Sequence, residues 1–392
     1  MKIAMPKNAE KIIDKLMNSG HIAFIVGGCV RDSILGREAN DFDITTSATP
    51  DETKALFERT IDTGIAHGTV TVIMEGEPYE VTTFRVDGEY NDSRHPDSVT
   101  FTKRIEDDLA RRDFTVNAMA YNYTHGLVDV FSGMDDLRRR VIRAVGDPKQ
   151  RFSEDALRIL RAIRFSSVLD FDIEEKTAAA ARALSGNLAL VSGERIFAEM
   201  KKLIGGKRAY RILIDFCDII KVFLPEFDPE RLPPEKKFLA LGLEYRMAAL
   251  LSSLGKSGLE EARQRLKMDN KTYLLADAVM SAKNPSDASE VSLKLHLIKY
   301  GDEVARASVA IGSAYGLYPE TALSLIDRLI AIDTPRTLSH LAIGGKDAMA
   351  IGIMGKEIGK ALGRALTAVA MGLVENEKGE LISYLKTSEV TE

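Results

Sequence analysis

At 392 residues the chain exceeds what one hydrophobic core usually accommodates, so we expect two to four domains. Hydrophobic residues make up 45% and charged residues 28%, as in an ordinary globular protein, and no apolar run reaches the roughly 18 residues that a membrane-spanning helix needs. The two cysteines, Cys29 and Cys217, lie too far apart in sequence to suggest a disulfide framework or a metal site. Because the N-terminus also lacks a signal-peptide core, the sequence predicts a cytoplasmic protein with no membrane partner.

The net charge of −5 argues weakly against nucleic-acid binding, but the charge is distributed unevenly. Between Arg138 and Arg211, 17 Lys and Arg residues stand against 9 Asp and Glu residues. This excess fits a solvated helix surface with salt bridges, and it fits equally a positive wall that faces phosphates. The charge count alone leaves both interpretations open.

Strand-like and helix-like segments alternate up to about residue 140. Apolar or alternating runs predict strands at 21–28, 41–46, 68–74, 78–84, 98–101 and 126–131, and amphipathic spacing predicts helices at 8–18, 29–36, 51–58 and 105–111. After residue 140 nearly every segment has helical periodicity, with proline-containing breaks at 225–236 and 284–289. The pattern predicts a mixed α and β domain followed by helices.

The stretch GGCVRDSILGREANDFDITT, residues 27–46, joins a glycine turn to a pair of aspartates. A glycine turn can offer backbone N–H groups to a phosphate. If 41–46 is a strand, Asp41 and Asp43 point to the same side and repel each other. Such a pair is tolerable on a wet surface or around a divalent cation, so the stretch raises the hypothesis of a metal and triphosphate site.

The stretch EDDLARRDFTVNAMAY, residues 106–121, places Arg111, Arg112 and Asp113 before an apolar run that we predict to be helical, with Asn117 one turn later. An aspartate in this position can be an ordinary helix cap. The same residues can instead supply a guanidinium group to a triphosphate and a carboxylate to a ribose hydroxyl. The stretch alone does not decide between these interpretations.

The stretch RFSEDALRILRAIRF, residues 151–165, carries charged residues at intervals of three. This spacing places them along one side of a predicted helix, in a slowly drifting stripe formed by Asp155, Arg158, Arg161 and Arg164. Aspartate and arginine in fixed geometry can match the hydrogen-bonding edge of a nucleotide base. A simple salt-bridge ladder is the alternative for this stretch taken alone.

These three motifs, in this order, resemble those of the bacterial class II tRNA nucleotidyltransferases, a family of CCA-adding enzymes and bacterial poly(A) polymerases. The resemblance covers residues 21–210, and residues 341–385 resemble the family's tRNA-contacting tail. It implies an α+β protein whose N-terminal nucleotidyltransferase head contains a small mixed β-sheet. The implied domains are the head (1–140), a helical neck with the nucleotide-base template (141–210), a helical body (211–284) and a helical tRNA-binding tail (285–392).

The resemblance implies which residues carry the chemistry. Asp41 and Asp43 would be the catalytic residues and would bind two Mg²⁺ ions, which activate the tRNA 3′-hydroxyl and stabilise the α-phosphate and the leaving pyrophosphate. Gly28 and Arg31 would hold the triphosphate. Arg112 would add a charge-assisted contact to the nucleotide.

The resemblance also assigns base selection to the third motif. Asp155 and Arg158 would pair with the incoming base and select CTP or ATP, and Asp113 would lie near the ribose. Arg161 and Arg164 would help to fix the template helix and the nucleotide.

Residues 84–101, FRVDGEYNDSRHPDSVTF, have the composition of a surface loop. In the family that this chain resembles, the corresponding loop is needed when the active site switches from CTP to ATP. Here the loop has its full length, and Arg85, Asp87 and Arg94 are available for polar contacts. This favours an enzyme that can add the terminal A.

The implied function is template-independent addition of CCA to tRNA, with contacts to the acceptor end and the elbow. Three rivals stay open. An A-adding enzyme would have the same motifs and loop. A poly(A) polymerase is disfavoured because no strongly basic extension follows residue 392. A non-catalytic RNA-binding protein would be expected to lack Asp41 or Asp43.

Overall fold

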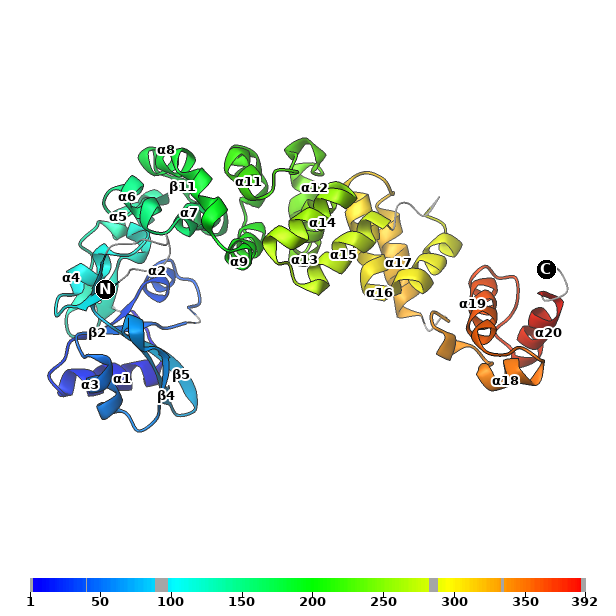
Figure 1. Cartoon of the computed structure of the whole chain (residues 1–392), viewed down its shortest axis with the longest axis horizontal. Helices are drawn as coiled ribbons and strands as arrows, with labels where there is room; N and C mark the ends of the chain where they lie inside the picture. The colour runs from blue at the N-terminus through cyan, green and yellow to red at the C-terminus, as the bar shows by residue number, and fades with distance from the viewer. Residues whose placement is uncertain (1–2, 40, 89–97, 282–287, 333–334, 389–392) are drawn as a thin grey trace. The chain divides into compact units, whose positions relative to one another are not determined.

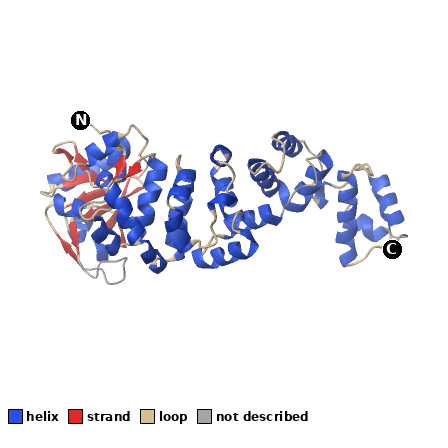
Figure 2. Ribbon diagram, turned by 90° about the horizontal axis from the view of Figure 1, so that it is seen from above, coloured by secondary structure: helices blue, strands red, loops and turns tan. Residues whose placement is uncertain are grey.

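The computed structural model describes residues 3–39, 41–88, 98–281, 288–332 and 335–388. The chain separates into two compact units, Met1–Pro225 and Glu226–Glu392 (Figure 1). The predicted head (1–140) and neck (141–210) both fall within the first unit, and their boundary stays a prediction. All described strands lie in the first unit, as Figure 2 shows in red.

A seven-stranded mixed sheet forms the centre of the first unit, in the order β3-β4-β5-β2-β1-β8-β9. Its strands are β1 (Ala23–Val26), β2 (Ile44–Thr46), β3 (Thr60–Gly64), β4 (Thr69–Met74), β5 (Glu77–Thr83), β8 (Ala120–Asn122) and β9 (Gly126–Val128). Neighbouring strands are antiparallel except for β2 and β5, which run parallel. This sheet and the helices that follow it confirm the predicted α+β class.

Two short strand pairs accompany the sheet. The strands β6 (Arg85–Asp87) and β7 (Val99–Phe101) pair antiparallel, so they bring together the two ends of the predicted 84–101 loop. The strands β10 (Val141–Ile142) and β11 (Asp172–Ile173) pair in parallel within the otherwise helical segment that follows the head.

Five helices of the head pack on the sheet or on the segments beside it. In the head these are α1 (Lys7–Asn18), α2 (Gly28–Ile34), α3 (Pro50–Leu56), α4 (Ile105–Ala110) and α5 (Gly133–Arg139). The first of these buries Ile12, Ile13 and Leu16 completely. The start of α3 is fixed by a capping box in which the Thr49 hydroxyl and the Glu52 carboxylate each bind the other's backbone N–H.

Two predictions for the head are wrong in detail. The strand predicted at 41–46 begins only at Ile44, so Asp41 and Asp43 lie in the loop before β2 rather than in strand alternation. The apolar run after Asp113 forms a short 3₁₀ turn, Thr115–Asn117, and then strand β8 rather than a helix. Pairing of β8 with β1 in the buried sheet overrides the helical pattern of this run.

The helical remainder of the first unit consists of α6 (Pro148–Glu154), α7 (Leu157–Leu169), α8 (Glu175–Ala183), α9 (Gly193–Ile204), α10 (Ala209–Asp215) and α11 (Cys217–Phe223). The helix predicted across 151–165 is therefore broken. Asp155 has an extended backbone (φ −138°, ψ 105°), and its Oδ1 accepts a hydrogen bond from the N–H of Leu157 at 3.0 Å. Asp155 thus precedes α7 instead of lying on it, which corrects the predicted stripe.

The regular elements among the described residues of the second unit are all helices. The unit contains α12 (Glu235–Ala240), α13 (Leu243–Ser252), α14 (Gly255–Leu266), α15 (Asn270–Ser281), α16 (Glu290–Ala314), α17 (Thr321–Ala331), α18 (Gly345–Ala350), α19 (Lys356–Ala370) and α20 (Lys378–Ser388). Helix α16 breaks at Gly301, whose φ of 74° interrupts the helical path. No helix in the described parts of either unit is long and apolar enough to cross a membrane.

The backbone at Gly206 packs closely against Ser167 of α7, and this contact gives a testable prediction. Gly206 is buried, and a Cβ there would lie 2.1 Å from Ser167 Oγ and 2.5 Å from the Ser167 carbonyl oxygen. The backbone must move to admit it, so Gly206→Ala should lower the free energy of unfolding by about 2–3 kcal/mol, measured by urea denaturation. The matched control is Gly205→Ala, since Gly205 is exposed with φ −70°. Equal stability of the two variants would contradict this packing.

Candidate active site

An acidic cavity of about 820 Å³ lies at the edge of the sheet where β2 begins. Asp41, Asp43 and Glu80 are among its lining residues. The parallel register of β2 and β5 pairs Ile44 with Val81, so Asp43 and Glu80, each one residue earlier, lie beside each other. The sequence analysis did not single out Glu80. Its signal was a lone acidic residue in the apolar strand PYEVTTF.

The electrostatics of this cavity favour a bound cation. The pKa of Asp43 is raised, first by desolvation and then by the negative charges of Glu80 and Asp41, while Arg112 opposes the shift. A divalent cation would relieve this repulsion. Among the described residues, no three Asp, Glu, His or Cys side chains form a ready-made metal site.

The glycine turn brings two arginines against the backbone. Gly27 has a φ of 83°, and a Cβ there would lie 3.0 Å from Arg112 Nη1, so glycine permits the close approach. Gly28 begins α2, and a Cβ on it would lie 3.6 Å from Arg31 Nη2. Arg31 is buried and donates to Asn117 Oδ1 at 2.5 Å and to both carboxylate oxygens of Asp32. The first and second motifs therefore meet here.

Asp113 is buried and binds protein groups through both oxygens. Its Oδ1 accepts from the Phe114 N–H at 2.8 Å and from Asn117 Nδ2 at 3.0 Å, and its Oδ2 accepts from Nε and Nη2 of Arg161 at 2.8 and 2.5 Å. Burial alone would raise the pKa of Asp113, but Arg161 and Asn117 lower it by more than burial raises it, to about 2. A contact with a ribose requires one of these partners to leave, so the ribose role stays a prediction.

The two residues predicted to read the base already have partners. Asp155 Oδ2 accepts from Arg195 Nη2 at 2.9 Å. Arg158 donates through Nη1 to Glu154 Oε2 at 2.7 Å and through Nη2 to the carbonyl oxygen of Arg111 at 3.0 Å. The sequence analysis missed Arg195, which lies 40 residues from Asp155 on α9. Its only signal was an arginine in the amphipathic segment GERIFAE.

The other two arginines of α7 point to a second missed residue, Glu199. This side chain is buried on α9, 2.7 Å from Arg164 Nε and 4.0 Å from Arg161 Nη1. Arg164 also stacks over the Phe165 ring at 3.7 Å. Burial lowers the pKa of Arg164 to about 10 although Glu199 opposes the shift. These contacts give Arg164 the role of fixing α7 against α9.

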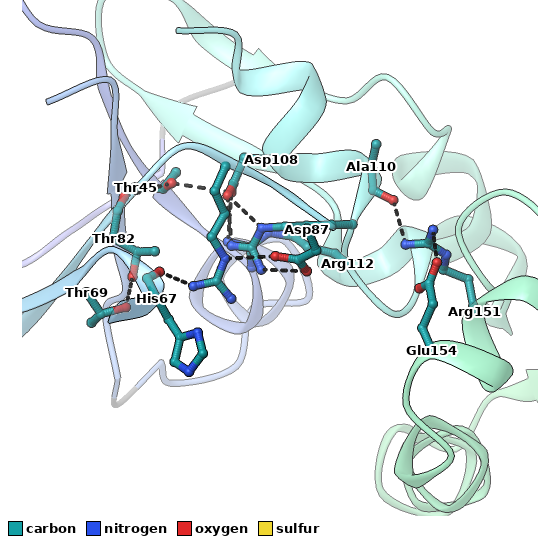
Figure 3. A network of polar contacts seen from close by, with 12 residues as sticks. Thr45, His67, Thr69, Thr82, Asp87, Asp108, Ala110, Arg112, Arg151 and Glu154 are labelled. Carbon is teal, nitrogen blue, oxygen red and sulfur yellow. Dashed lines mark hydrogen bonds and ion pairs between the residues drawn. The ribbon is translucent and has the colours of Figure 1, made fainter. Parts of the chain in front are cut away.

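The start of the 84–101 loop contacts the second motif through Arg85 and Asp87. Arg85 Nε donates to Asp87 Oδ1 at 3.1 Å, and its Nη1 donates to the carbonyl oxygen of His67. Asp87 Oδ2 lies 4.0 Å from Arg111 Nη1. Figure 3 shows Asp87 among these contacts. The third predicted loop residue, Arg94, lies outside the described residues.

Two family models match the chain. The model described as "Poly A polymerase head domain" matches residues 23–143, and the model described as "Probable RNA and SrmB- binding site of polymerase A" matches residues 170–231. The first match contains the acidic cavity, the glycine turn and the second motif. The third motif, around Asp155 and Arg158, lies between the two matched segments.

The chain is also similar along its whole length to individual proteins. It is 39% identical to the CCA-adding enzyme of Geobacillus stearothermophilus and 36% identical to that of Pediococcus pentosaceus, with 95% and 96% of each chain covered in the two comparisons. The structure of the Bacillus stearothermophilus CCA-adding enzyme in complex with CTP matches with a TM-score of 0.82 and 34% identity, over 99% of both chains. The Thermotoga maritima CCA-adding enzyme complexed with tRNA shares the fold, with a TM-score of 0.70 and 22% identity over 99% of this chain and 100% of that one.

The Asp113–Arg161 pair gives a prediction about pH and stability. The folded pKa of Asp113 is about 2, below the unfolded value of 3.8. The pair therefore stabilises the fold above pH 3.8, and this contribution is lost as the pH falls from 3.8 to 2. Asp113→Asn should lower the free energy of unfolding by about 2 kcal/mol at pH 7. The difference from the unsubstituted protein should shrink below pH 4, as followed by urea denaturation.

The control is Asp135→Asn, because Asp135 is exposed and pairs only with the exposed Arg138 among its recorded ion pairs. A surface pair of this kind contributes at most about 1 kcal/mol. If Asp113→Asn were no more destabilising than Asp135→Asn at pH 7, the buried pair would not hold the second motif to α7.

Proposed function

The chain belongs to the family of CCA-adding enzymes, and we propose that it adds C, C and A to the 3′ ends of tRNA from CTP and ATP without a nucleic-acid template. The observation that carries the proposal is the convergence of all three motifs. Asp43 of the acidic cavity interacts electrostatically with Arg112, and the neighbouring Arg111 carbonyl holds Arg158. Nucleotidyl transfer needs this combination of charge neutralisation and positioning rather than a covalent intermediate.

We assign the metal-binding role to Asp41 and Asp43. Their oxygens are the ligand type that Mg²⁺ prefers, and the raised pKa of Asp43 marks a negative site that a cation would stabilise. When bound, two Mg²⁺ ions would activate the tRNA 3′-hydroxyl and stabilise charge on the α-phosphate and the pyrophosphate. Glu80 shapes this site from β5 because it lies beside Asp43 and adds negative charge.

Donors for the triphosphate come from Arg112, which interacts electrostatically with Asp43 of the cavity. The buried Nε of Arg112 has no hydrogen-bond partner in the described structure, although the rest of the guanidinium group contacts Asp108 and the Gly27 turn. An unsatisfied buried donor is costly, so a phosphate oxygen there would be strongly favoured. Together with Arg31 and the backbone of Gly28, Arg112 gives the site its positive charge.

Base selection would fall to Asp155 and Arg158. The carboxylate can accept from an exocyclic amino group, and the guanidinium group can donate to ring acceptors, as cytosine and adenine require. Arg161 and Arg164 hold the helix on which Arg158 lies. The switching role of the 84–101 loop stays a prediction, because residues 89–97 lie outside the described structure.

Full CCA addition is favoured over addition of A alone because the full-length relatives are named CCA-adding enzymes. We expect tRNA contacts at the acceptor end and the elbow, the latter from the second unit. We also place the reaction in the cytoplasm, which agrees with the absence of a disulfide between Cys29 and Cys217.

The reaction is tested with tRNA that lacks one, two or all three terminal nucleotides, with CTP and ATP supplied separately and together. Products are resolved to single nucleotides on a gel. We expect two additions with CTP alone and three with both nucleotides on the shortest tRNA. Extension only of tRNA that already ends in CC would identify an A-adding enzyme instead. A long adenosine tail would identify a poly(A) polymerase.

Asp41→Asn and Asp43→Asn should each lower the addition rate by at least roughly a thousandfold in this assay, because each removes a charge that the metal ions require. The tRNA dissociation constant should change little. Asp135→Asn again serves as the exposed control. Turnover near that of the unsubstituted protein in either cavity variant would refute the metal assignment.

Arg158→Ala should damage selection among nucleotides more than nucleotide affinity. Losing a hydrogen-bonding partner for the base costs on the order of 1–3 kcal/mol of discrimination, or about 5- to 150-fold. The measurement is the ratio of kcat/KM for CTP to that for UTP, with Arg138→Ala as an exposed control. An unchanged ratio would show that Arg158 is only structural.

A further inference from the structure

The carboxylate of Asp108 is buried between three parts of the head: the start of the 84–101 loop, the glycine turn and the second motif. Asp108 is on α4 and its exposed fraction is 0%. Its Oδ1 accepts from Arg111 Nε at 3.0 Å and Nη2 at 2.8 Å, and its Oδ2 accepts from Arg112 Nη2 and Thr45 Oγ1, both at 3.3 Å. Figure 3 shows Asp108 between Thr45 and Arg112. The buried carboxylate of Asp108 thus pairs with two successive arginines, Arg111 and Arg112.

This arrangement follows from the end of α4. Arg111 and Arg112 lie three and four residues after Asp108, so both side chains can return to the same carboxylate. Taking a carboxylate out of water is costly unless it is fully paired. Burial raises the pKa of Asp108, but Arg111 and Arg112 lower it by more, so the group remains ionised.

The bond to Asp108 determines where the Arg112 guanidinium group points. One of its ends binds Asp108, another lies against the Gly27 turn, and the buried Nε is left without a partner in the described structure. Without the Asp108 anchor, a flexible arginine side chain would reach many other positions. The anchor therefore determines how well Arg112 is prepared for a nucleotide.

Arg111, which binds Asp108 through its side chain, also contacts the third motif through its backbone. The carbonyl oxygens of Ala110 and Arg111 accept from Arg151 Nη1 at 3.2 Å and from Arg158 Nη2 at 3.0 Å. Because the Arg111 side chain folds back onto Asp108, the turn that carries these carbonyl groups is held in place. Figure 3 shows Ala110 accepting from Arg151, which also pairs with Glu154.

We propose that Asp108 is a positioning residue for nucleotide binding: it holds Arg112 toward the triphosphate and fixes the backbone turn that seats Arg158. The proposal rests on the proposed function, since it assumes that Arg112 and Arg158 contact the nucleotide. It adds a residue that does not itself face the acidic cavity, because Asp108 is wholly enclosed by protein.

The test is Asp108→Asn in the full-length protein, assayed for addition to tRNA lacking its terminal nucleotides. The substitution keeps the shape and removes the charge, so Arg112 loses a charge-assisted hydrogen bond. We expect KM for both CTP and ATP to rise roughly tenfold or more. KM for tRNA should stay within about twofold, because the second unit is untouched.

The matched control is Asp107→Asn, on the same helix. Asp107 is partly exposed, accepts from Thr102 Oγ1 at 2.8 Å, and has no recorded contact with Arg111 or Arg112. Its nucleotide KM should remain unchanged. If Asp108→Asn behaved like this control, Asp108 would not position the nucleotide and the proposal would be overturned, whereas the proposed function would stand. An inactive unsubstituted protein would overturn both.

A double-mutant cycle separates positioning from support of the fold. In an Arg112→Ala background, Asp108→Asn should change kcat/KM for nucleotides less than in the unsubstituted protein, since one of the two groups that Asp108 positions is gone. Full additivity would mean that Asp108 acts through the fold in general and would overturn the proposal.

A second variant keeps the proposal testable should Asp108→Asn fail to fold. Arg112→Lys retains a positive charge beside Asp108 but cannot engage the carboxylate and a phosphate with one rigid fork. We expect a folded protein, by its thermal unfolding midpoint, with nucleotide KM raised as in Asp108→Asn. Unchanged KM in Arg112→Lys would show that the anchored orientation is irrelevant and would overturn the proposal.

Discussion

Pairing of buried arginines with buried carboxylates is the constraint on which the rest of this site depends. An ionised group removed from water costs several kcal/mol unless an opposite charge and hydrogen bonds replace the solvent. Three such carboxylates, Asp108, Asp113 and Glu199, form ion pairs with arginines of the second and third motifs. Each comes from a different element, so the pairs join α4, the turn before β8 and α9 into one arrangement that the apolar cores alone would not determine.

Internal pairing accounts for part of the positive charge that the sequence analysis noted between Arg138 and Arg211. The excess of positive residues between Arg138 and Arg211 is not a bare wall of cations. Several of its arginines pair with carboxylates: Arg140 with Asp170, Arg143 with Asp136, Arg151 and Arg158 with Glu154, Arg161 with Asp113, Arg164 with Glu199, and Arg195 with Asp155. These arginines are therefore held by counter-charges within the protein, so their positions would be set before a substrate arrives.

The sequence predicted the fold class well, because strand and helix patterns depend on residues that are close together in the sequence. The three motifs could be recognised for the same reason. Prediction failed where a distant partner decides the outcome. Asp155 lies outside the helix since its carboxylate caps Leu157 and pairs with Arg195, and β8 is a strand since β1 is beside it. Glu80 and Glu199 were missed for the same reason: only the sheet register and the packing of α9 on α7 reveal what they face.

The same pairing explains how a small site could choose between bases. Arg158 and Asp155 are both satisfied by protein partners, so a nucleotide can engage them only by offering hydrogen bonds that replace those lost. Cytosine and adenine both carry an exocyclic amino group for the carboxylate, and uracil offers a carbonyl oxygen in its place. A base that leaves either group unpaired in this enclosed position meets a penalty that water cannot offset. In the proposed function, selection would then arise from the cost of breaking these hydrogen bonds and ion pairs, and its accuracy would depend on how rigidly the surrounding carboxylates hold them.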